Sequence, residues 1–527
     1  MTAEAAAYLM RRHLVVVHPS QPKVLLERGP DGAPRLPVQD EPLGDSRSAL
    51  GLAGLLGPEL PLVSLGQIAF FRRAAEEGAD GVVTELLTAC ELFPAPPVDV
   101  LRRHEWSGAG EGATVLGLPT PLAEALAGYL GWLAAENGAT EAEPAPAEGA
   151  ARRGHAPGEP APAEPPPHSL PGSTAALAAA MRAEVAEGDG TREGACSTLE
   201  PLVPGDGSAA PLRQLQSWVL SSVWLGDAAA VKVTNPLWPN EPAVTAAIHS
   251  LRPDLVPAVV AHGRYAVARG VSEPARGGSA EPALGGSHVP DRDHRVAAWM
   301  VTRRFEEDHV RTATTSDVLN ALAELQAAAS GRHAELLAAG VLKRGPHEVA
   351  ADLGMLWSSP QLAHLTDAER AALPVLERRL GERLARLASA APLLLTHGDL
   401  HQGNAAFTRA GGELPVLFDW TDAALAWPGV DLVTLAGIDE EPNAAELLAL
   451  RDAYLVAVRA AFHDHPGLLT GVEATLDEGL ALAPVYHAVA YAHIAAAVPP
   501  AQRAFVDAGR VVSWVVRSML ARWRADA

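Results

Sequence analysis

The order of apolar and polar residues divides this 527-residue chain into stretches of different character. Short apolar runs at residues 13–18, 24–26 and 62–71 are typical of strands that lie between turn-forming residues. Residues 122–134 are expected to form a helix. We therefore expect residues 1–138 to form a small accessory α+β domain.

A proline-rich segment follows this domain. Nine prolines lie between residues 144 and 171, interleaved with Ala, Glu and Gly. Such a segment buries too little apolar surface to offset the entropy lost on ordering, and its prolines favour an extended chain. Residues 139–172 are therefore predicted to be a semi-stiff linker.

The remaining chain, residues 173–527, begins with a predicted helix at 173–185, and predicted strands follow it. A strand pair is expected within residues 212–233, further strands at 258–262 and 297–302, and a helix at 241–251. A stretch rich in Gly, Ser and Pro at 271–291 predicts a loop. These elements predict a strand-rich lobe over about residues 173–305.

Helices dominate after residue 304. Val318, Leu322, Leu325 and Ala329 recur at intervals that place them on one face of a helix. Further helices are expected at about residues 367–387, 444–462, 476–496 and 502–524. A helical lobe over about residues 306–527 is therefore expected to follow the strand-rich lobe.

One polar loop interrupts the helices. Residues 393–432 read LLLTHGDLHQGNAAFTRAGGELPVLFDWTDAALAWPGVDL. Residues 393–396 predict a strand, and residues 405–408 and 414–418 flank a Gly-rich turn and predict a hairpin. The polar loop therefore lies between two strands, and Asp419 closes the second strand of the hairpin.

The residues of this loop suit phosphoryl transfer. Asp399 follows a glycine, so the backbone can turn tightly and present its carboxylate as a base. Asn404 comes five residues later, and Asp419 returns beside it across the hairpin. An amide and a carboxylate oxygen suit Mg²⁺, a hard cation that also binds substrate phosphates. The pattern Asp-x4-Asn followed by a further Asp is that of a kinase catalytic loop.

The segment HGDLHxGN, followed by a strand and an Asp-Trp pair, resembles the aminoglycoside phosphotransferase/choline kinase superfamily over about residues 173–527. The resemblance implies a bilobal protein-kinase-like fold. It also implies Asp399 as the catalytic base, and Asn404 and Asp419 as Mg²⁺ ligands. Asp431 is then the helix-borne residue that supports the loop.

Three further polar residues of the segment are expected to have supporting roles. His397 and His401 flank Asp399, and His401 is expected to orient the loop, because Asp399 already fills the role of base. Asp422 is either a group that supports the metal ligands or an ordinary acidic residue at a helix N-terminus.

The nucleotide is expected to bind the strand-rich lobe. A kinase needs a cation on the α- and β-phosphates and a carboxylate that holds this cation. Lys232, near the end of a strand, and Glu241, at the start of the next helix, match that family pattern. Ser221 and Ser222 stand where a glycine-rich turn over the phosphates is expected, and Met300 lies in the expected hinge between the lobes.

The composition sharpens the interest in Lys232. Lys23, Lys232 and Lys343 are the only lysines among 41 basic residues, and 63 acidic residues give a net charge of −22. The acidic balance argues against binding to nucleic acid or to anionic lipid. The N-terminal sequence lacks the pattern of a secretory signal, no membrane-spanning stretch is expected, and two distant cysteines suggest a cytoplasmic protein.

The accessory domain faintly resembles the Nudix fold in the segment PKVLLERGPDGAPRLP, although the glutamate-rich Nudix box is absent. For the whole chain, the leading hypothesis is Mg²⁺-dependent transfer of a phosphoryl group from ATP or GTP to a hydroxyl of a small molecule. An aminoglycoside, a sugar or an amino alcohol is the expected acceptor. The alternatives are a catalytically idle kinase-like protein, and a bifunctional enzyme whose first domain is also active. The oligomeric state stays open.

Overall fold

The computed structural model divides the chain into two compact units. One comprises Met1–Pro236, Gly263–Met300 and Pro499–Phe505, and the other comprises Leu237–His262, Val301–Val498 and Val506–Ala527. The structure describes residues 8–19, 21, 23–28, 30, 32–42, 49, 52, 55–56, 60, 62–74, 82–92, 95–108, 118–138, 174, 176–181, 213–217, 220–226, 229–235, 237–266, 296–304, 311–359, 362–363, 365–409, 411–438, 441–498 and 508–525. The expected linker at 139–172 and the expected loop at 271–291 lie outside the described residues.

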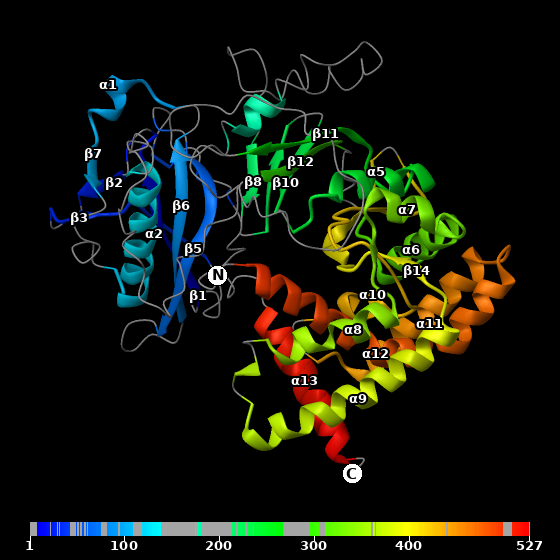
Figure 1. The fold of residues 1–527 in the computed structure, drawn as a ribbon. Coiled ribbons are helices and arrows are strands. Elements are labelled where there is room, and N and C mark those ends of the chain that lie inside the picture. The colour runs from blue at the N-terminus through cyan, green and yellow to red at the C-terminus, as the bar shows by residue number, and fades with distance from the viewer. Residues whose placement is uncertain are drawn as a thin grey trace, which may run out of the picture. The chain divides into compact units, whose positions relative to one another are not determined.

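The N-terminal part is built on a seven-stranded sheet (Figure 1). Its elements are β1 (Tyr8–Val17), β2 (Lys23–Arg28), β3 (Pro34–Arg35), β4 (Val38–Pro42), β5 (Leu62–Ala74), β6 (Val82–Leu92), α1 (Val98–Leu101), β7 (Glu105–Gly108) and α2 (Thr120–Gly138). The central path runs β3-β2-β1-β6-β5, with β4 on β1 and β7 on β2. Strands β1 and β6 are parallel, whereas the other recorded pairs are antiparallel.

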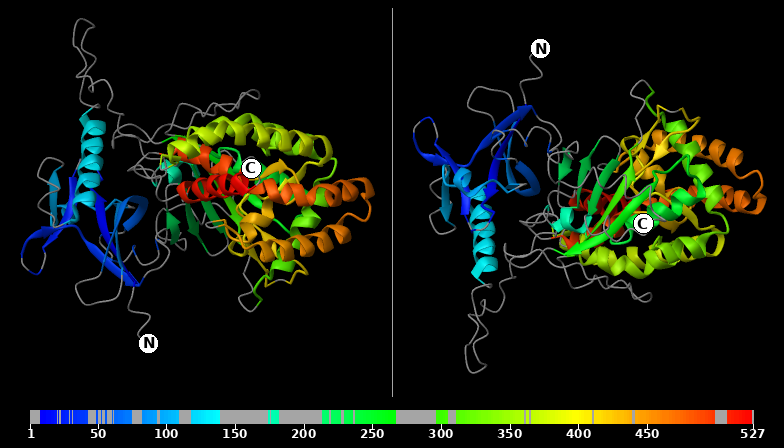
Figure 2. Two further views of the ribbon diagram at one scale, coloured as in Figure 1. Left: turned by 90° about the horizontal axis from the view of Figure 1, so that it is seen from below. Right: turned by 90° about the horizontal axis from the view of Figure 1, so that it is seen from above.

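Both faces of this sheet are buried. Val15 and Val17 pack toward α2, whereas Leu14 and Val16 join a second cluster that contains Leu52. Figure 2 shows α2 beside the sheet from two further directions. Because neighbouring residues of a strand point to opposite faces, the unbroken apolar run at residues 14–17 of β1 reflects this two-sided burial.

A five-stranded sheet follows, in the order β11-β12-β10-β9-β8. Its strands are β8 (Arg213–Ser217), β9 (Ser221–Leu225), β10 (Ala229–Thr234), β11 (Val259–Ala266) and β12 (Val296–Arg303). The strand pair expected at residues 212–233 is therefore wrong, because this stretch forms three strands. A β-bulge between Gln214 and Gln216 breaks the alternation that would have revealed β8.

Strand β8 contacts strand β5 of the N-terminal sheet, and both strands carry a bulge near the contact. Strand β5 also carries a bulge, between Ser64 and Gly66, and Gly66 has a φ of 112°. The Gln214 side chain accepts a hydrogen bond from the Ser64 backbone N–H (2.9 Å) and donates to the Ser64 carbonyl (2.8 Å). The Ala49 N–H donates to the Leu215 carbonyl at 3.0 Å. The accessory domain is thus hydrogen-bonded to the edge strand of the second sheet.

The second unit is mostly helical. Its elements are α5 (Glu241–Leu251), α6 (Thr315–Ala329), α7 (His333–Ala339), β13 (Leu342–Lys343), α8 (Pro346–Trp357), α9 (Asp367–Ala390), β14 (Leu394–Thr396), η6 (Gln402–Asn404), β15 (Ala405–Ala406), β16 (Val416–Leu417), β17 (Ala424–Ala426), α10 (Val430–Leu435), α11 (Ala444–Ala461), α12 (Pro466–Ala497) and α13 (Ala508–Ala525). The predicted change from strands to helices is confirmed.

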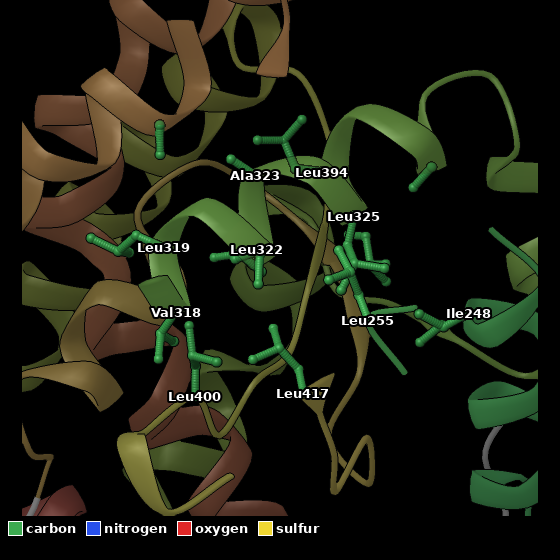
Figure 3. Close-up of a cluster of buried hydrophobic side chains, with 14 of the residues drawn as sticks. Ile248, Leu255, Val318, Leu319, Leu322, Ala323, Leu325, Leu394, Leu400 and Leu417 are labelled. Atoms are coloured by element: carbon green, nitrogen blue, oxygen red, sulfur yellow. The ribbon is translucent and has the colours of Figure 1, made fainter. Parts of the chain in front are cut away.

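The polar loop rests on a buried apolar cluster. Val318, Leu322 and Leu325 of α6 face Leu394 and Leu400, which lie on either side of the loop's start (Figure 3). Helix α6 begins at a capping box, in which Thr314 and Asp317 exchange hydrogen bonds. The α6 face predicted from the spacing therefore supports the segment that carries Asp399.

A second cluster joins helices α8, α9, α12 and α13. Figures 1 and 2 show α12 and α13 side by side. By length and composition alone, α12 is long and apolar enough to cross a membrane. Core helices of soluble proteins pass the same test, and 56% of its most apolar window is buried within the fold.

Candidate active site

The loop that carries Asp399 begins at a buried strand. Strand β14 is fully buried in a three-stranded sheet, and its partner β17 aligns Thr396 with Ala424. The Asp399 loop, residues 397–404, then leaves this sheet and ends in η6. The Asp399 side chain is 46% exposed, so its carboxylate is open to a reactant although the loop around it is anchored.

Asp431 supports the start of this loop. Its two carboxylate oxygens accept hydrogen bonds from the backbone N–H groups of His397 (3.0 Å) and Gly398 (2.8 Å). Burial raises the pKa of Asp431 to about 6, the two backbone hydrogen bonds lower it, and the charge of Asp399 raises it further. The supporting position that the resemblance implied for Asp431 is therefore present in the structure.

The two histidines contact the backbone of the site. The His397 ring is buried, lies 4.6 Å from the Trp420 ring between centroids, and has its Nε2 at 2.9 Å from the Phe418 carbonyl. The Nδ1 of His401 accepts a hydrogen bond from the Gly403 N–H at 3.0 Å. One contact is made within the loop, and the other joins the loop to the residue that follows β16.

Asn404 and Asp419 meet across the small hairpin. Strands β15 and β16 pair Ala405 with Leu417, and the Phe418 N–H donates to the Asn404 carbonyl at 3.0 Å. The Asn404 side-chain N–H donates to the Asp399 carbonyl at 2.9 Å, which fixes the orientation of the amide. Asp419 has a φ of 69°, and its Oδ1 accepts a hydrogen bond from the Thr421 hydroxyl.

The donor set fits a magnesium ion. The Asn404 amide oxygen and the Asp419 carboxylate are hard oxygen ligands, and such sites take their remaining ligands from water and phosphate. Within the described part of the chain, no group of three or more His, Cys, Asp or Glu residues forms a metal cluster. The predicted metal site likewise has two protein ligands, Asn404 and Asp419, and so needs no such cluster.

Asp422 lies in a turn before β17, so no helix begins there and the alternative of a helix N-terminal charge is wrong. Its Oδ1 accepts a hydrogen bond from the Trp238 indole N–H at 3.2 Å. Removal from solvent, followed by the charges of Asp399 and Asp419, raises the pKa of Asp422 to about 6, while Arg344 and the indole lower it. Asp422 is thus a further carboxylate close enough to interact with the charges of Asp399 and Asp419.

The predicted nucleotide residues fall in both units. Lys232 lies on β10 opposite Val223, and Glu241 begins α5 with its side chain buried. Ser221 and Ser222 are buried at the start of β9, so their expected position in a turn is wrong. Both serines pair with neighbouring strands, Ser222 with Ser217 of β8 and Ser221 with Thr234 of β10. Met300 is buried in β12, at the point where the two units divide.

Three aromatic or histidine side chains of α12 and α13 are used in contacts within the helical unit. Tyr486 and His487 are buried, and the Nε2 of His487 lies 3.0 Å from the Val430 carbonyl. Burial lowers the pKa of His487 to about 4. Trp514 donates to the Ile438 carbonyl at 2.8 Å. These contacts assign the three side chains to the support of the fold.

A family model matches the part of the chain that carries the site. Residues 243–465 match the model of the phosphotransferase enzyme family. No curated protein matches the chain. The family match confirms the resemblance predicted from residues 393–432, and the observed order of elements confirms the mixed α+β fold.

Solved structures of small-molecule kinases are also similar to the chain. The GDP complex of a mutant aminoglycoside 2'-phosphotransferase IIIa is 13% identical, with 60% of this chain and 93% of that chain covered and a TM-score of 0.39. A choline/ethanolamine kinase family protein from Mesorhizobium loti is 16% identical, with coverages of 65% and 94% and a TM-score of 0.36. A glucosamine kinase in complex with glucosamine, ADP and phosphate is 18% identical, with coverages of 67% and 82% and a TM-score of 0.30.

Two side chains that contact the site, Trp238 and Gln326, were not predicted from the sequence. Trp238 lies in the Pro-flanked segment LWPNEP, where its ring could have been assigned to the core. Gln326 donates to the Leu395 carbonyl of β14 at 3.0 Å and accepts from the Tyr454 hydroxyl at 2.6 Å. Apolar spacing on α6 identifies a buried face, but it gives no sign of a polar group within that face.

Proposed function

We propose that this protein transfers the γ-phosphoryl group of ATP or GTP to a hydroxyl group of a small molecule. The observation that carries the proposal is the arrangement of the Asp399 loop. Asp431 accepts hydrogen bonds from the backbone just before Asp399, and the hairpin brings together Asn404 and Asp419, whose side-chain oxygens are the proposed metal ligands. The match of residues 243–465 to the phosphotransferase enzyme family supports this class of reaction.

In the proposed reaction, Asp399 orients the acceptor hydroxyl and receives its proton. A bond forms between the acceptor oxygen and the γ-phosphorus as the bond to the β-phosphate bridging oxygen breaks, and a nucleoside diphosphate leaves. A Mg²⁺ ion held by Asn404 and Asp419 would neutralise charge on the phosphate oxygens. Positioning supplies most of the rate enhancement, because phosphoryl transfer asks little covalent chemistry of the protein.

Lys232 is proposed to contact the nucleotide phosphates, and Glu241 to hold its ammonium group. A lysine on a strand and a glutamate at the start of the next helix are the groups that a kinase uses for this purpose. Ser221, Ser222 and Met300 remain proposed nucleotide-binding residues of the same lobe.

The acceptor is proposed to be an aminoglycoside, a sugar or an amino alcohol. Solved structures similar to this chain include kinases named for aminoglycosides, choline or ethanolamine, and glucosamine. A thermal-shift screen of these classes with Mg²⁺ and ATP or GTP identifies the acceptor, since a ligand at about 100 times its Kd stabilises a fold by about 2.7 kcal/mol.

Turnover of the identified acceptor then tests the site. Asp399→Asn should abolish nearly all transfer while the fold stays intact. Lys232→Met should lower kcat/KM for the nucleotide far more than Lys343→Met, because Lys343 forms an exposed ion pair with Glu348 (2.8 Å). Nucleotide binding without turnover of any acceptor would instead indicate an idle kinase-like protein.

A further inference from the structure

The segment between β10 and α5 reaches the Asp399 loop through one side chain. Trp238 is half-buried and lies three residues before Glu241. Its indole N–H donates to Oδ1 of Asp422 at 3.2 Å, across 184 residues of sequence. The start of α5 is therefore tied to the turn that follows the proposed metal ligand Asp419.

Asp422 in turn contacts the Asp399 loop through its backbone. Gly398 has a φ of 85°, and a Cβ atom placed on it would lie 2.3 Å from the Asp422 carbonyl oxygen and 2.7 Å from the Asp422 Cβ. Gly398 and Asp422 are thus in close contact, with no room for any side chain between them. A shift of the turn at Asp422 would move Gly398 and the neighbouring Asp399.

The charges around Asp422 show why this turn needs a hydrogen-bond donor. Asp399 and Asp419 both act on Asp422 with like charge, and Arg344 acts on it with opposite charge. Arg344 also lies over the Tyr486 ring, with its guanidinium carbon 5.5 Å from the ring centroid. The indole N–H supplies a directed contact to a carboxylate that two neighbouring carboxylates repel.

We infer that Trp238 and Asp422 are positioning residues for phosphoryl transfer, and that their hydrogen bond holds the Asp399 loop in its active arrangement. The inference rests on the proposed function for its kinetic consequence. Neither side chain needs to touch the reacting atoms. Trp238 acts through Asp422, and Asp422 acts through its contact with Gly398.

The test replaces the donor and the acceptor of this hydrogen bond separately. Trp238→Phe keeps an aromatic ring and removes the N–H, whereas Asp422→Asn keeps an oxygen that can accept the bond. Trp238→Phe and Asp422→Ala should each lower kcat on the order of tenfold, with the KM for nucleotide within about twofold of the wild type. Asp422→Asn should retain more of kcat than Asp422→Ala. In the Asp422→Ala background, Trp238→Phe should cause no further loss, because the bond is already absent.

A second measurement does not depend on turnover. Amide hydrogen exchange in a peptide that covers residues 396–404 should accelerate in Trp238→Phe, since the His397 and Gly398 N–H groups lie in the held segment. Trp357→Phe is the matched control, because the indole nitrogen of Trp357 is buried and has no hydrogen-bond partner. This control should leave the exchange of that peptide and kcat unchanged.

The outcomes separate this inference from the proposed function. If the wild type and Asp399→Asn both fail to transfer phosphate to any acceptor, the proposed function fails and the exchange measurement alone decides the positioning role. Unchanged exchange of residues 396–404 in Trp238→Phe would overturn the inference. So would a loss of kcat in Trp238→Phe that Trp357→Phe reproduces, because such a loss would reflect general packing.

Discussion

Replacing Asp431 by Asn tests how strongly the Asp399 loop depends on one buried carboxylate. Each oxygen of Asp431 accepts one backbone N–H, from His397 on one side and from Gly398 on the other. Asn offers only one acceptor oxygen, and its NH₂ group would face the second backbone N–H. The substitution therefore removes one hydrogen bond and places two donors against each other in a buried site.

Two opposing effects set the change in stability. A hydrogen bond to a charged group contributes about 1.5–3 kcal/mol, and Asp431→Asn loses one such bond. The ionised carboxylate lowers the free energy of unfolding at neutral pH, because a pKa raised from 3.8 to about 6 corresponds to about 3 kcal/mol. We therefore expect the free energy of unfolding of Asp431→Asn at pH 7 to lie close to that of the wild type.

Activity should respond much more strongly than stability. If losing this hydrogen bond destabilises the active conformation of the loop by its full free energy, kcat should fall by about 10- to 150-fold. The assay is turnover of the identified acceptor. Asp464→Asn serves as the control, because the Asp464 side chain is 81% exposed and belongs to a turn of the helical unit.

The pH dependence gives a second, independent signature. Below about pH 4 the Asp431 carboxyl is protonated in both the folded and the unfolded chain. The protonated group then makes its full contribution to the free energy of unfolding. That contribution is lost as the pH rises through the folded-state pKa of about 6. The wild type should therefore lose up to about 3 kcal/mol of stability relative to Asp431→Asn between about pH 4 and pH 7. A difference between the two proteins that stays constant with pH, or an Asp431→Asn protein with full kcat, would refute this reasoning.

Two further substitutions test the surroundings of the loop. Gly398→Ala should abolish most activity and lower the melting temperature, because its Cβ would lie 2.3 Å from the Asp422 carbonyl oxygen. Gly411→Ala is the control: Gly411 has a similar φ of 84° but open space around it, so this substitution should cost about 1 kcal/mol of backbone strain. Tyr454→Phe should reduce the free energy of unfolding by about 1–3 kcal/mol in a denaturant titration, because it leaves the buried Gln326 without its 2.6 Å partner, and an unchanged midpoint would contradict this role.

The polar segment was predictable from sequence because its geometry is local. The strand at 394–396, the loop and the hairpin follow from apolar runs and glycines within forty residues, and the structure places Asn404 and Asp419 together as the spacing predicted. The spacing also predicted the face of α6 that supports the loop. In these cases the residues that determine the structure are neighbours in the chain.

The parts that were missed depend on distant contacts or on irregular strands. Strand β8 was not separated from β9, because its bulge breaks the alternation of side chains. The position of Ser222 inside β9 was missed as well, because it depends on pairing with Ser217 and Val233 in the sheet. Trp238 could not be linked to Asp422, because a hydrogen bond between residues 184 positions apart leaves no periodic trace in the sequence.

The contact between Gln214 and Ser64 has a consequence for how the chain can be divided. Strand β8 stands at the end of its sheet, and an edge strand that loses its cover offers unpaired backbone groups to other chains. A protein cut within residues 139–172 would keep the whole family match yet lose the strand that contacts β8. We expect such a fragment to self-associate through β8. In the whole protein, the first 138 residues would prevent this association by covering that edge strand.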